Sequence, residues 1–419
     1  MLRLNKLTSY IFFSLLFSPV LAYAYVVWLK LPKTLSIFLS FLFFGYGLVF
    51  FAIKKYSIVF PTLAKFLLVF AIYQAISTYI FGGDRHILTQ IYHYILNFTI
   101  LLVILIINNS NFTDKFIQRS ILVIKITIII TAIVSIIQVF DTSFFNAREY
   151  FREGVPGWDQ TPVSLYRYRR TSIFSFIEPL ALGLSFIPLL SLLIGYLLYS
   201  NKHFLIYLIA GGITAFLSNT RYIMIGYLIV AIQIIVYNKI KSKRLFKYML
   251  IFIASIIIIG VSLQYLGYDL NQWYEERLLN EGSIEETTRY KAIGTFIDFF
   301  PDKPFLGTGG LTEEVREVSK SVGSSHIHVG YLSHLVYYGI VGCFFLYGFW
   351  YLLAKRLYTT AKLSGYWGSF FGFLTFLWSF ATMSQSSIFY YGIFFCLIFD
   401  KYYRDKYAEI TAFNRRNPS

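Results

Sequence analysis

The sequence predicts an all-α membrane protein that crosses the bilayer many times. Of its 419 residues, 57% are hydrophobic and 20% aromatic, whereas only 14% are charged, far below the roughly one quarter that soluble domains carry. Apolar runs of about 15 to 25 residues recur along the chain, long enough to cross a hydrocarbon core of roughly 30 Å. A membrane β-barrel would instead show alternating apolar and polar residues over about ten positions.

About 12 segments have the length and composition of a transmembrane helix. We expect them at residues 10–29, 34–53, 60–81, 87–107, 119–140, 173–199, 204–219, 222–238, 248–266, 328–353, 367–384 and 386–400. The first resembles a signal peptide, because residues 22–24 imitate a small-residue cleavage site. Its apolar run continues to Leu29, so we expect an uncleaved span instead.

The net charge of +16 follows the pattern of a membrane protein. Most Lys and Arg lie in short loops on one side of the predicted bilayer, as in the basic run of residues 239–247. The positive-inside bias puts this side and both termini in the cytoplasm. This arrangement explains the charge without a nucleic-acid partner, and we expect none.

Two long loops then face the opposite side, at residues 141–170 and 267–327. We expect a single transmembrane domain over residues 1–419, with the second loop partly helical and packed over it. That loop contains Arg289 and Tyr290 in a helix that ends before Pro301, followed by the turn-rich stretch 304–310.

Arg221 is the most unusual charged residue of the chain. The polar stretch 217–222 interrupts an apolar run from about Phe204 to Tyr237 that is too long for one span and short for two. A charge near mid-bilayer costs about 2.5–3.5 kcal/mol on insertion scales, so such residues tend to be functional and to face the protein interior. An arginine simply placed at an outer turn is the alternative.

A second group of charges stands where the first long loop enters the membrane. Arg169 and Arg170 end that loop, and Glu178 lies about two turns into the following span. An unpaired carboxylate there would be costly. An ion pair with an arginine and a role in a substrate site explain Glu178 equally well.

His326 and His328 stand at the end of the second long loop, where an apolar helix begins. If that helix begins near His328, this residue shares one face with Tyr331, Gly339 and Gly342. The alternative is a histidine that lies at the membrane interface, where a span ends, and has no functional role. Arginine suits phosphate oxygens and histidine has the pKa of a general base, so we expect an outward site that holds a diphosphate and deprotonates a hydroxyl.

The sequence contains no motif typical of a metal site, a disulfide framework or a phosphate-binding loop. Cys343 and Cys396 lie within predicted spans, and no spacing typical of a metal site or a disulfide framework is present. The 307–310 stretch lacks the Gly-Lys-Ser/Thr end of a phosphate-binding P-loop. We therefore expect no metal and no cofactor.

Several motifs, taken in order, resemble the family of O-antigen polymerases (Wzy type) and O-antigen ligases. The motifs are Ser218-Asn-Thr-Arg221, Thr288-Arg289-Tyr290, Pro304-Phe-Leu-Gly-Thr-Gly, His328-x-x-Tyr331-Leu332 and Gly339-x-x-Gly342, with a weaker match at residues 170–179. His328 fits the family register and His326 does not. Val329 replaces the asparagine that usually follows the family histidine.

The resemblance implies metal-independent, inverting glycosyl transfer at the periplasmic face of a bacterial inner membrane. The donor and acceptor would be oligosaccharides on undecaprenyl diphosphate, and membrane lipids, a flippase and a chain-length regulator would be the other partners. Arg221 and Arg289 would bind the diphosphate, His328 would activate the acceptor hydroxyl, and Arg170 would be an auxiliary donor contact. Arg169, Glu178, Tyr290 and His326 complete the expected substrate-binding set.

Other functions remain open at this point. An O-antigen ligase, which transfers the glycan to lipid A core, shares these features; we favour a polymerase because the chain is very aromatic and its motifs depart from the more regular ligase pattern. A flippase or other transporter predicts internal repeats and short outer loops. A metal-dependent glycosyltransferase would need acidic ligands in an early outer loop, where the sequence offers only Asp84. A non-enzymatic sensor or assembly protein is the last alternative.

Overall fold

The computed structural model describes residues 2–24, 28–29, 35–54, 58–81, 87–141, 144–145, 172–177, 182–218, 220–238, 261, 264–265, 288–310, 315, 317, 327, 329–382 and 391–416. Every regular element in these ranges is a helix. Four of them are long and apolar enough to span a membrane, at Thr62–Phe81, Asp114–Phe140, Leu182–Tyr199 and Gly330–Ser364. The predicted class, an all-α membrane protein, is confirmed.

The N-terminal segment is not the single span predicted at residues 10–29. Helix α1 (Leu2–Leu15) ends, and α2 (Ser18–Tyr23) begins after a two-residue turn. A proline stands in the first turn of α2. Because proline has no N–H for the preceding turn and its ring crowds it, one helix cannot run through this position undisturbed.

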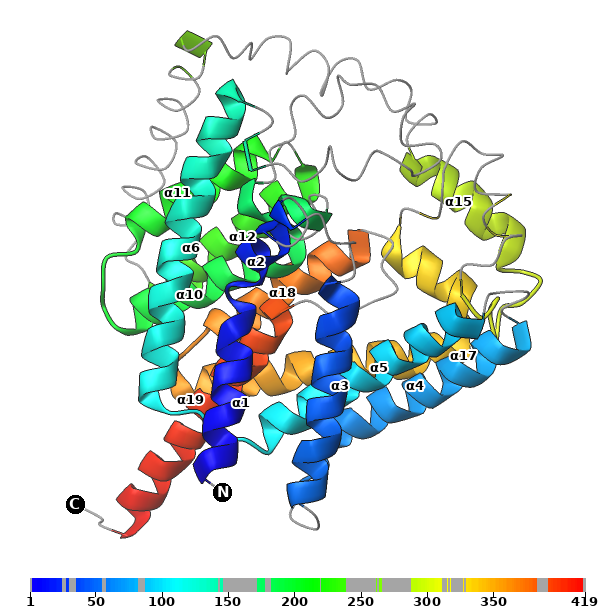
Figure 1. Ribbon diagram of the computed structural model, residues 1–419, viewed down its shortest axis with the longest axis horizontal. Coiled ribbons are helices and arrows are strands. Elements are labelled where there is room, and N and C mark those ends of the chain that lie inside the picture. The colour runs from blue at the N-terminus through cyan, green and yellow to red at the C-terminus, as the bar shows by residue number, and fades with distance from the viewer. Residues whose placement is uncertain are drawn as a thin grey trace.

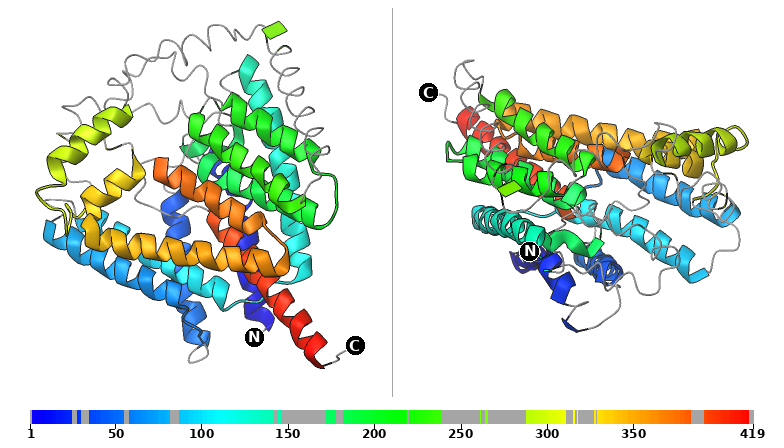
Figure 2. Two further views of the ribbon diagram at one scale, coloured as in Figure 1. Left: turned by 180° about the vertical axis from the view of Figure 1, so that it is seen from behind. Right: turned by 90° about the horizontal axis from the view of Figure 1, so that it is seen from above.

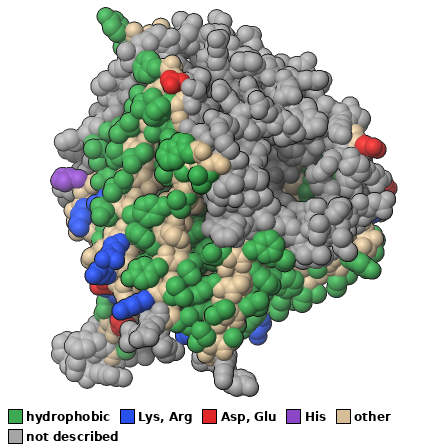
Figure 3. All heavy atoms as spheres, viewed as in Figure 1, with side chains coloured by type: hydrophobic (Ala, Val, Ile, Leu, Met, Phe, Trp, Pro, Cys, Tyr) green, Lys and Arg blue, Asp and Glu red, His purple; other side chains and the backbone are tan. Residues whose placement is uncertain are grey.

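The next four helices agree with the predicted spans to within a few residues. They are α3 (Leu35–Lys54), α4 (Thr62–Phe81), α5 (Ile87–Asn108) and α6 (Asp114–Phe140). Thr113 caps the start of α6, and its side chain accepts a hydrogen bond from the backbone N–H of Phe116. A stripe of exposed apolar side chains follows one face of α6 at helical spacing, from Leu122 to Phe140. Figure 3 shows it as part of a broad apolar surface, as expected of a surface that faces lipid.

The span predicted at residues 173–199 is broken into three types of helix. A 3-10 helix, η3 (Ser172–Ile177), is followed by a π-helical turn, η4 (Leu182–Phe186), and by α10 (Ile187–Tyr199). Proline at position 188 lacks the N–H that would bond the carbonyl of residue 184 in a regular α-helix. Helix-widening turns of this kind occur mostly at functional sites.

The C-terminal half contains six further described helices. They are α11 (Leu205–Leu217), α12 (Arg221–Asn238), α15 (Thr288–Phe299), α17 (Gly330–Ser364), α18 (Gly368–Thr382) and α19 (Tyr391–Arg416). The predicted span 248–266 lies almost wholly outside the described residues. Helices α17 and α19 both continue more than ten residues past the predicted spans 328–353 and 386–400, because polar residues extend a helix as readily as apolar ones once it has begun.

Helix α18 lies at the centre of the bundle and packs against α10, α12, α17 and α19 (Figures 1 and 2). Glycines allow this packing: a Cβ on Gly195 of α10 would lie 2.5 Å from the Cα of Gly368 in α18. Helix α4 lies along α17, and α15 packs near the beginning of α17. The start of α1 and the end of α19 lie at the same end of the molecule (Figure 1).

Candidate functional site

Helix α17 is broken at Gly339, and this break organises the candidate site. Gly339 has φ +60° and ψ −173°, which separates a first half at residues 330–338 from a second half at residues 340–364. A Cβ at this position would lie 2.3 Å from the carbonyl oxygen of Phe305. Only glycine combines this left-handed φ with so close an approach of another backbone. The single continuous helix predicted from His328 through Gly342 is therefore wrong.

A helix break leaves backbone N–H and C=O groups without partners, and residues 304–310 supply those partners. The carbonyls of Pro304 and Phe305 accept hydrogen bonds from the N–H groups of Ile340 (2.8 Å) and Val341 (3.2 Å). In return, residues 308 and 309 donate their N–H groups to the carbonyls of residues 336 (2.8 Å) and 337 (3.0 Å). We call residues 304–310 the 304–310 loop; its exchange of hydrogen bonds with both halves of α17 fixes the angle of the break.

The glycines of the loop are required by this close packing. Gly307 and Gly309 have φ values of +71° and +74°, a region that side chains disfavour. A Cβ on Gly307 would meet the backbone of residues 337 and 339 at 2.6 Å, and one on Gly309 would meet the carbonyl oxygen of Ser77 at 2.5 Å. The stretch contains the predicted Pro-Phe-Leu-Gly-Thr-Gly motif, but its docking into the helix break was not predicted from the sequence.

Polar side chains of α4 also form hydrogen bonds with the loop, and these residues were not predicted from the sequence. The Tyr73 hydroxyl lies 2.8 Å from two backbone carbonyl oxygens, that of Leu306 in the loop and that of Tyr338 at the end of the first half of α17. The Thr78 hydroxyl donates to the carbonyl of Gly309 (2.8 Å). A Cβ on Gly342 would lie 2.5 Å from the Tyr73 ring. The two predicted glycines therefore have separate roles. Gly339 allows the break in α17, and Gly342 leaves the space that the Tyr73 ring occupies.

His334 is a further residue that was not predicted from the sequence. It is 1% exposed in the first half of α17, with its ring 4.8 Å from that of Phe380 and 6.0 Å from that of Tyr338. Its Nδ1 lies 3.3 Å from the hydroxyl of Tyr347, which belongs to the second half. The contact therefore joins the two halves of α17 across the break. Its place within a predicted span could have identified it, because ionisable residues within spans are rare and tend to be functional.

Two predicted site motifs lie in or next to the starts of α15 and α17. Arg289 and Tyr290 belong to the first turn of α15, which packs against α17. His328 lies outside the described residues, but its neighbours Ile327 and Val329 are buried at 0% and 7% exposure. Since α17 begins at Gly330 and α15 at Thr288, the backbone brings these two helix starts to the same part of the fold (Figure 1).

Arg221 stands at the predicted polar break between two helices. Helix α11 ends at Leu217 and α12 begins at Arg221, and the Thr220 hydroxyl donates to the carbonyl of Ser218 (2.8 Å). The indole N–H of Trp378 donates to the carbonyl of Tyr222 (3.0 Å), which ties the start of α12 to α18. The Arg221 side chain is exposed, so the expectation that it points into the protein interior is wrong.

The remaining predicted residues are not placed. Arg169, Arg170, Glu178 and His326 lie outside the described residues, as His328 does. The described π-turn η4 begins four residues after Glu178 in the chain. Among the described residues, no group of three or more His, Cys, Asp or Glu side chains could hold a metal ion.

These features define a helical membrane protein whose polar centre is a glycine-rich loop docked into a broken helix. Residues 205–347 match the family model described as O-antigen ligase. The matched segment begins with α11, contains the Arg221 break, α15 and the 304–310 loop, and ends at Tyr347. The match supports the O-antigen ligase and polymerase superfamily and a membrane glycan-processing function. The comparison with curated proteins found no match.

Proposed function

We propose that this protein is a glycosyltransferase that polymerises oligosaccharide repeat units carried on undecaprenyl diphosphate. The observation that carries the proposal is the 304–310 loop docked at Gly339 within the segment that matches the family. The loop follows α15, which begins at Thr288 and packs against α17, and it docks into α17, whose first half begins two residues after His328. The proposal requires that these two motifs, far apart in the sequence, act on one substrate, with Arg289 as the cation and His328 as the base.

The proposed reaction is a single displacement at the anomeric carbon of the donor. The acceptor hydroxyl forms the new C–O bond while the bond from the anomeric carbon to the diphosphate breaks, which inverts the configuration. His328 takes the hydroxyl proton as general base. Arg289 and Arg221 stabilise the negative charge that develops on the departing diphosphate, and Arg170 and Arg169 provide further contacts. The exposed position of Arg221 leaves it accessible to a large lipid-linked substrate.

The proposed setting is a bacterial inner membrane with the site facing the periplasm. Described Lys and Arg side chains gather toward one end of the apolar surface (Figure 3), and the start of α1 and the end of α19 lie at the same end of the molecule (Figure 1). With the positive-inside bias, this supports cytoplasmic termini. A flippase that delivers the repeat units and a chain-length regulator are the proposed partners.

An O-antigen ligase is the second candidate, because the matching family model carries that description. In that case the same residues would act on the same type of donor, with the acceptor hydroxyl on lipid A core instead of on another repeat unit. The geometry of the loop and the break serves both reactions equally, since both transfer a glycan from a diphosphate to a hydroxyl.

The test compares surface glycans in a strain that lacks the gene and in strains complemented with wild type or His328→Ala at equal membrane level. If wild type restores a ladder and His328→Ala leaves a single repeat on the core, the polymerase assignment holds. A null strain without glycan on the core, but with accumulated lipid-linked polymer, would establish the ligase. Repeat units accumulating on the cytoplasmic side, with His328→Ala equal to wild type, would refute both and favour a transporter.

A further inference from the structure

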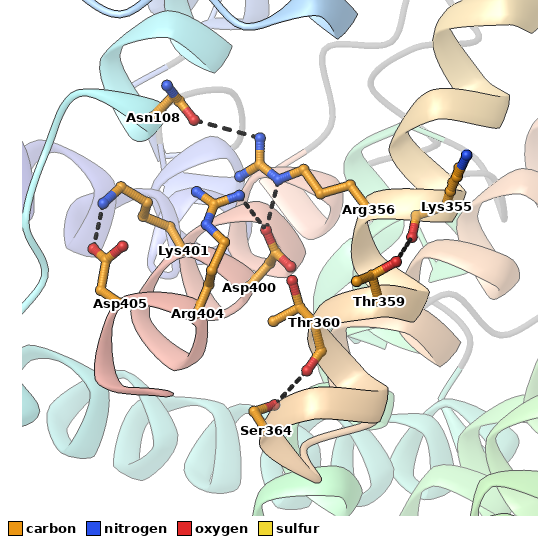
Figure 4. A network of polar contacts seen from close by, with 10 residues as sticks. All are labelled: Asn108, Lys355, Arg356, Thr359, Thr360, Ser364, Asp400, Lys401, Arg404 and Asp405. Carbon is orange, nitrogen blue, oxygen red and sulfur yellow. Dashed lines mark hydrogen bonds and ion pairs between the residues drawn. The ribbon is translucent and has the colours of Figure 1, made fainter. Parts of the chain in front are cut away.

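A cluster of polar and charged residues joins α5, α17 and α19. It lies toward the end of α17, whereas the 304–310 loop docks near the beginning of that helix. We call Asn108 of α5, Arg356 of α17, and Asp400 and Arg404 of α19 the Asp400 cluster (Figure 4). It lies outside the segment that matches the family model, which ends at residue 347. The proposed glycosyl transfer assigns no role to it.

One carboxylate in this cluster serves two guanidinium groups. Arg356 Nε donates to Asp400 Oδ2 at 2.9 Å, and Arg356 Nη1 donates to Asn108 Oδ1 at 3.4 Å. Arg404 Nη1 lies 3.6 Å from the same Asp400 oxygen, too far for a hydrogen bond. The cluster therefore carries one positive charge more than its carboxylate neutralises. Burial and the neighbouring Arg356 lower the pKa of Arg404 from its ordinary value, which reflects the cost of this excess charge.

Two other acidic groups in or next to α19 have partners of their own. Asp405 forms an ion pair with Lys401, and Asp114 accepts a hydrogen bond from the Tyr402 hydroxyl at 2.6 Å. Lys406 in turn donates to that hydroxyl at 3.2 Å. Asp405 also acts on Arg404 electrostatically, but its ion pair is with Lys401. Asp400 is the carboxylate that forms an ion pair with Arg404, and Arg356 holds it more closely.

The Arg404 guanidinium, which carries the excess positive charge, is partly exposed. The Arg404 side chain is 34% exposed, whereas Asp400 is 0% exposed behind it and Arg356 is 14% exposed. Along α17, exposed apolar side chains such as Tyr351 and Tyr358 alternate with cations toward the end of the helix. A phospholipid phosphate lies at this kind of border between apolar and cationic surface, and a guanidinium can bind two of its oxygens at once.

We propose that Arg404, backed by Arg356, binds the phosphate of an anionic phospholipid at this end of the membrane domain. The bound phosphate supplies the counter-charge that Asp400 cannot provide to both arginines. Under the proposed topology this end lies in the cytoplasmic leaflet. The binding does not depend on the proposed glycosyl transfer, and its test uses no activity measurement.

The experiment titrates the purified full-length protein in detergent with phosphatidylglycerol and follows its melting temperature and lipid retention by native mass spectrometry. We expect phosphatidylglycerol to raise the melting temperature, whereas phosphatidylcholine does not. Arg404→Gln should need about tenfold more lipid for the half-maximal effect, the size expected for a lost charge-assisted contact. Lys362→Gln, which removes an exposed charge from the last turn of α17, should bind as wild type does.

The proposal is overturned if Arg404→Gln and wild type have the same half-maximal lipid concentration, or if phosphatidylcholine acts as phosphatidylglycerol does. Inorganic phosphate that reproduces the full shift would overturn it in favour of a site for a free anion. Should Arg404→Gln fail to fold, Arg404→Lys decides, because it keeps the charge and loses the planar fork. Weaker lipid retention in Arg404→Lys supports the proposal, and unchanged retention refutes it.

Discussion

At the scale of single residues, Gly339 determines the geometry of the site. Its positive φ breaks α17, and its missing side chain lets the Phe305 carbonyl approach to where a Cβ would be. The two requirements are independent, since one concerns the backbone angle of the residue itself and the other the space that its neighbour occupies. Any side chain at this position must therefore move the 304–310 loop.

We predict that Gly339→Ala lowers the free energy of unfolding and abolishes polymer formation. The backbone angles of Gly339, φ +60° and ψ −173°, lie in a region essentially restricted to glycine and cost another residue about 1–3 kcal/mol. The 2.3 Å approach to Phe305 adds a clash with backbone that cannot rotate away. Thermal unfolding in detergent and the glycan ladder measure the two effects.

The matched control is Gly294→Ala in α15. A Cβ at Gly294 meets nothing within 4 Å, and alanine in a helix interior is favoured over glycine by about 0.5–1 kcal/mol. This variant should unfold at an equal or higher temperature. Equal behaviour of the two variants would contradict the role assigned to Gly339.

At the scale of elements, the site depends on a helix that carries none of the predicted catalytic residues. Helix α4 supplies the hydroxyls of Tyr73 and Thr78 to the backbone of the 304–310 loop and of α17. The Tyr338 carbonyl is one that the break leaves without a partner within the helix, whereas the Leu306 and Gly309 carbonyls belong to the loop that α4 holds in place. The arrangement of α15 relative to α17 thus depends on α4 through the loop between them.

We predict that Tyr73→Phe destabilises the protein by about 1–3 kcal/mol, because the donor shared by the Tyr338 and Leu306 carbonyls is lost while the ring remains. Ser77, which also donates to the Leu306 carbonyl (3.3 Å), stays in place. Activity should fall further than stability explains, since the loop positions the helix starts. Thermal unfolding and the glycan ladder at matched protein level provide the measurement. Tyr79→Phe removes an 80% exposed hydroxyl from the same helix and should change stability by less than about 0.5 kcal/mol.

At the scale of the whole molecule, the 304–310 loop and the cation-rich helix ends lie at opposite ends of α17. The 304–310 loop docks near its beginning, and the Asp400 cluster joins its second half to α5 and α19. The apolar surface between them carries the stripe of α6 (Figure 3). This separation supports the proposed orientation, in which the cation-rich end faces the cytoplasm and the proposed site faces the other side of the membrane.

We predict that a cysteine at position 302 and one at position 202 react from opposite sides of the membrane. Both Asp302 and Lys202 are exposed, and the two native cysteines are buried, so background labelling is low. An impermeant maleimide should label Asp302→Cys in intact spheroplasts and Lys202→Cys only after permeabilisation. The reverse pattern would overturn the proposed orientation, and labelling of both from outside would overturn the span count.

The sequence by itself determined the class of protein, most helix positions and the polar break before Arg221. These follow from local properties, because the length and hydropathy of a segment are set by its own residues. Only the tertiary structure decided that α17 breaks at Gly339, that the 304–310 loop fills the break, and that Tyr73 and His334 belong to the site. Each of these depends on contacts between residues far apart in the chain: Tyr73 and Gly342 are neighbours only because α4 and α17 pack together. A periodic pattern predicts a continuous helix until another segment supplies the hydrogen bonds that make a break stable.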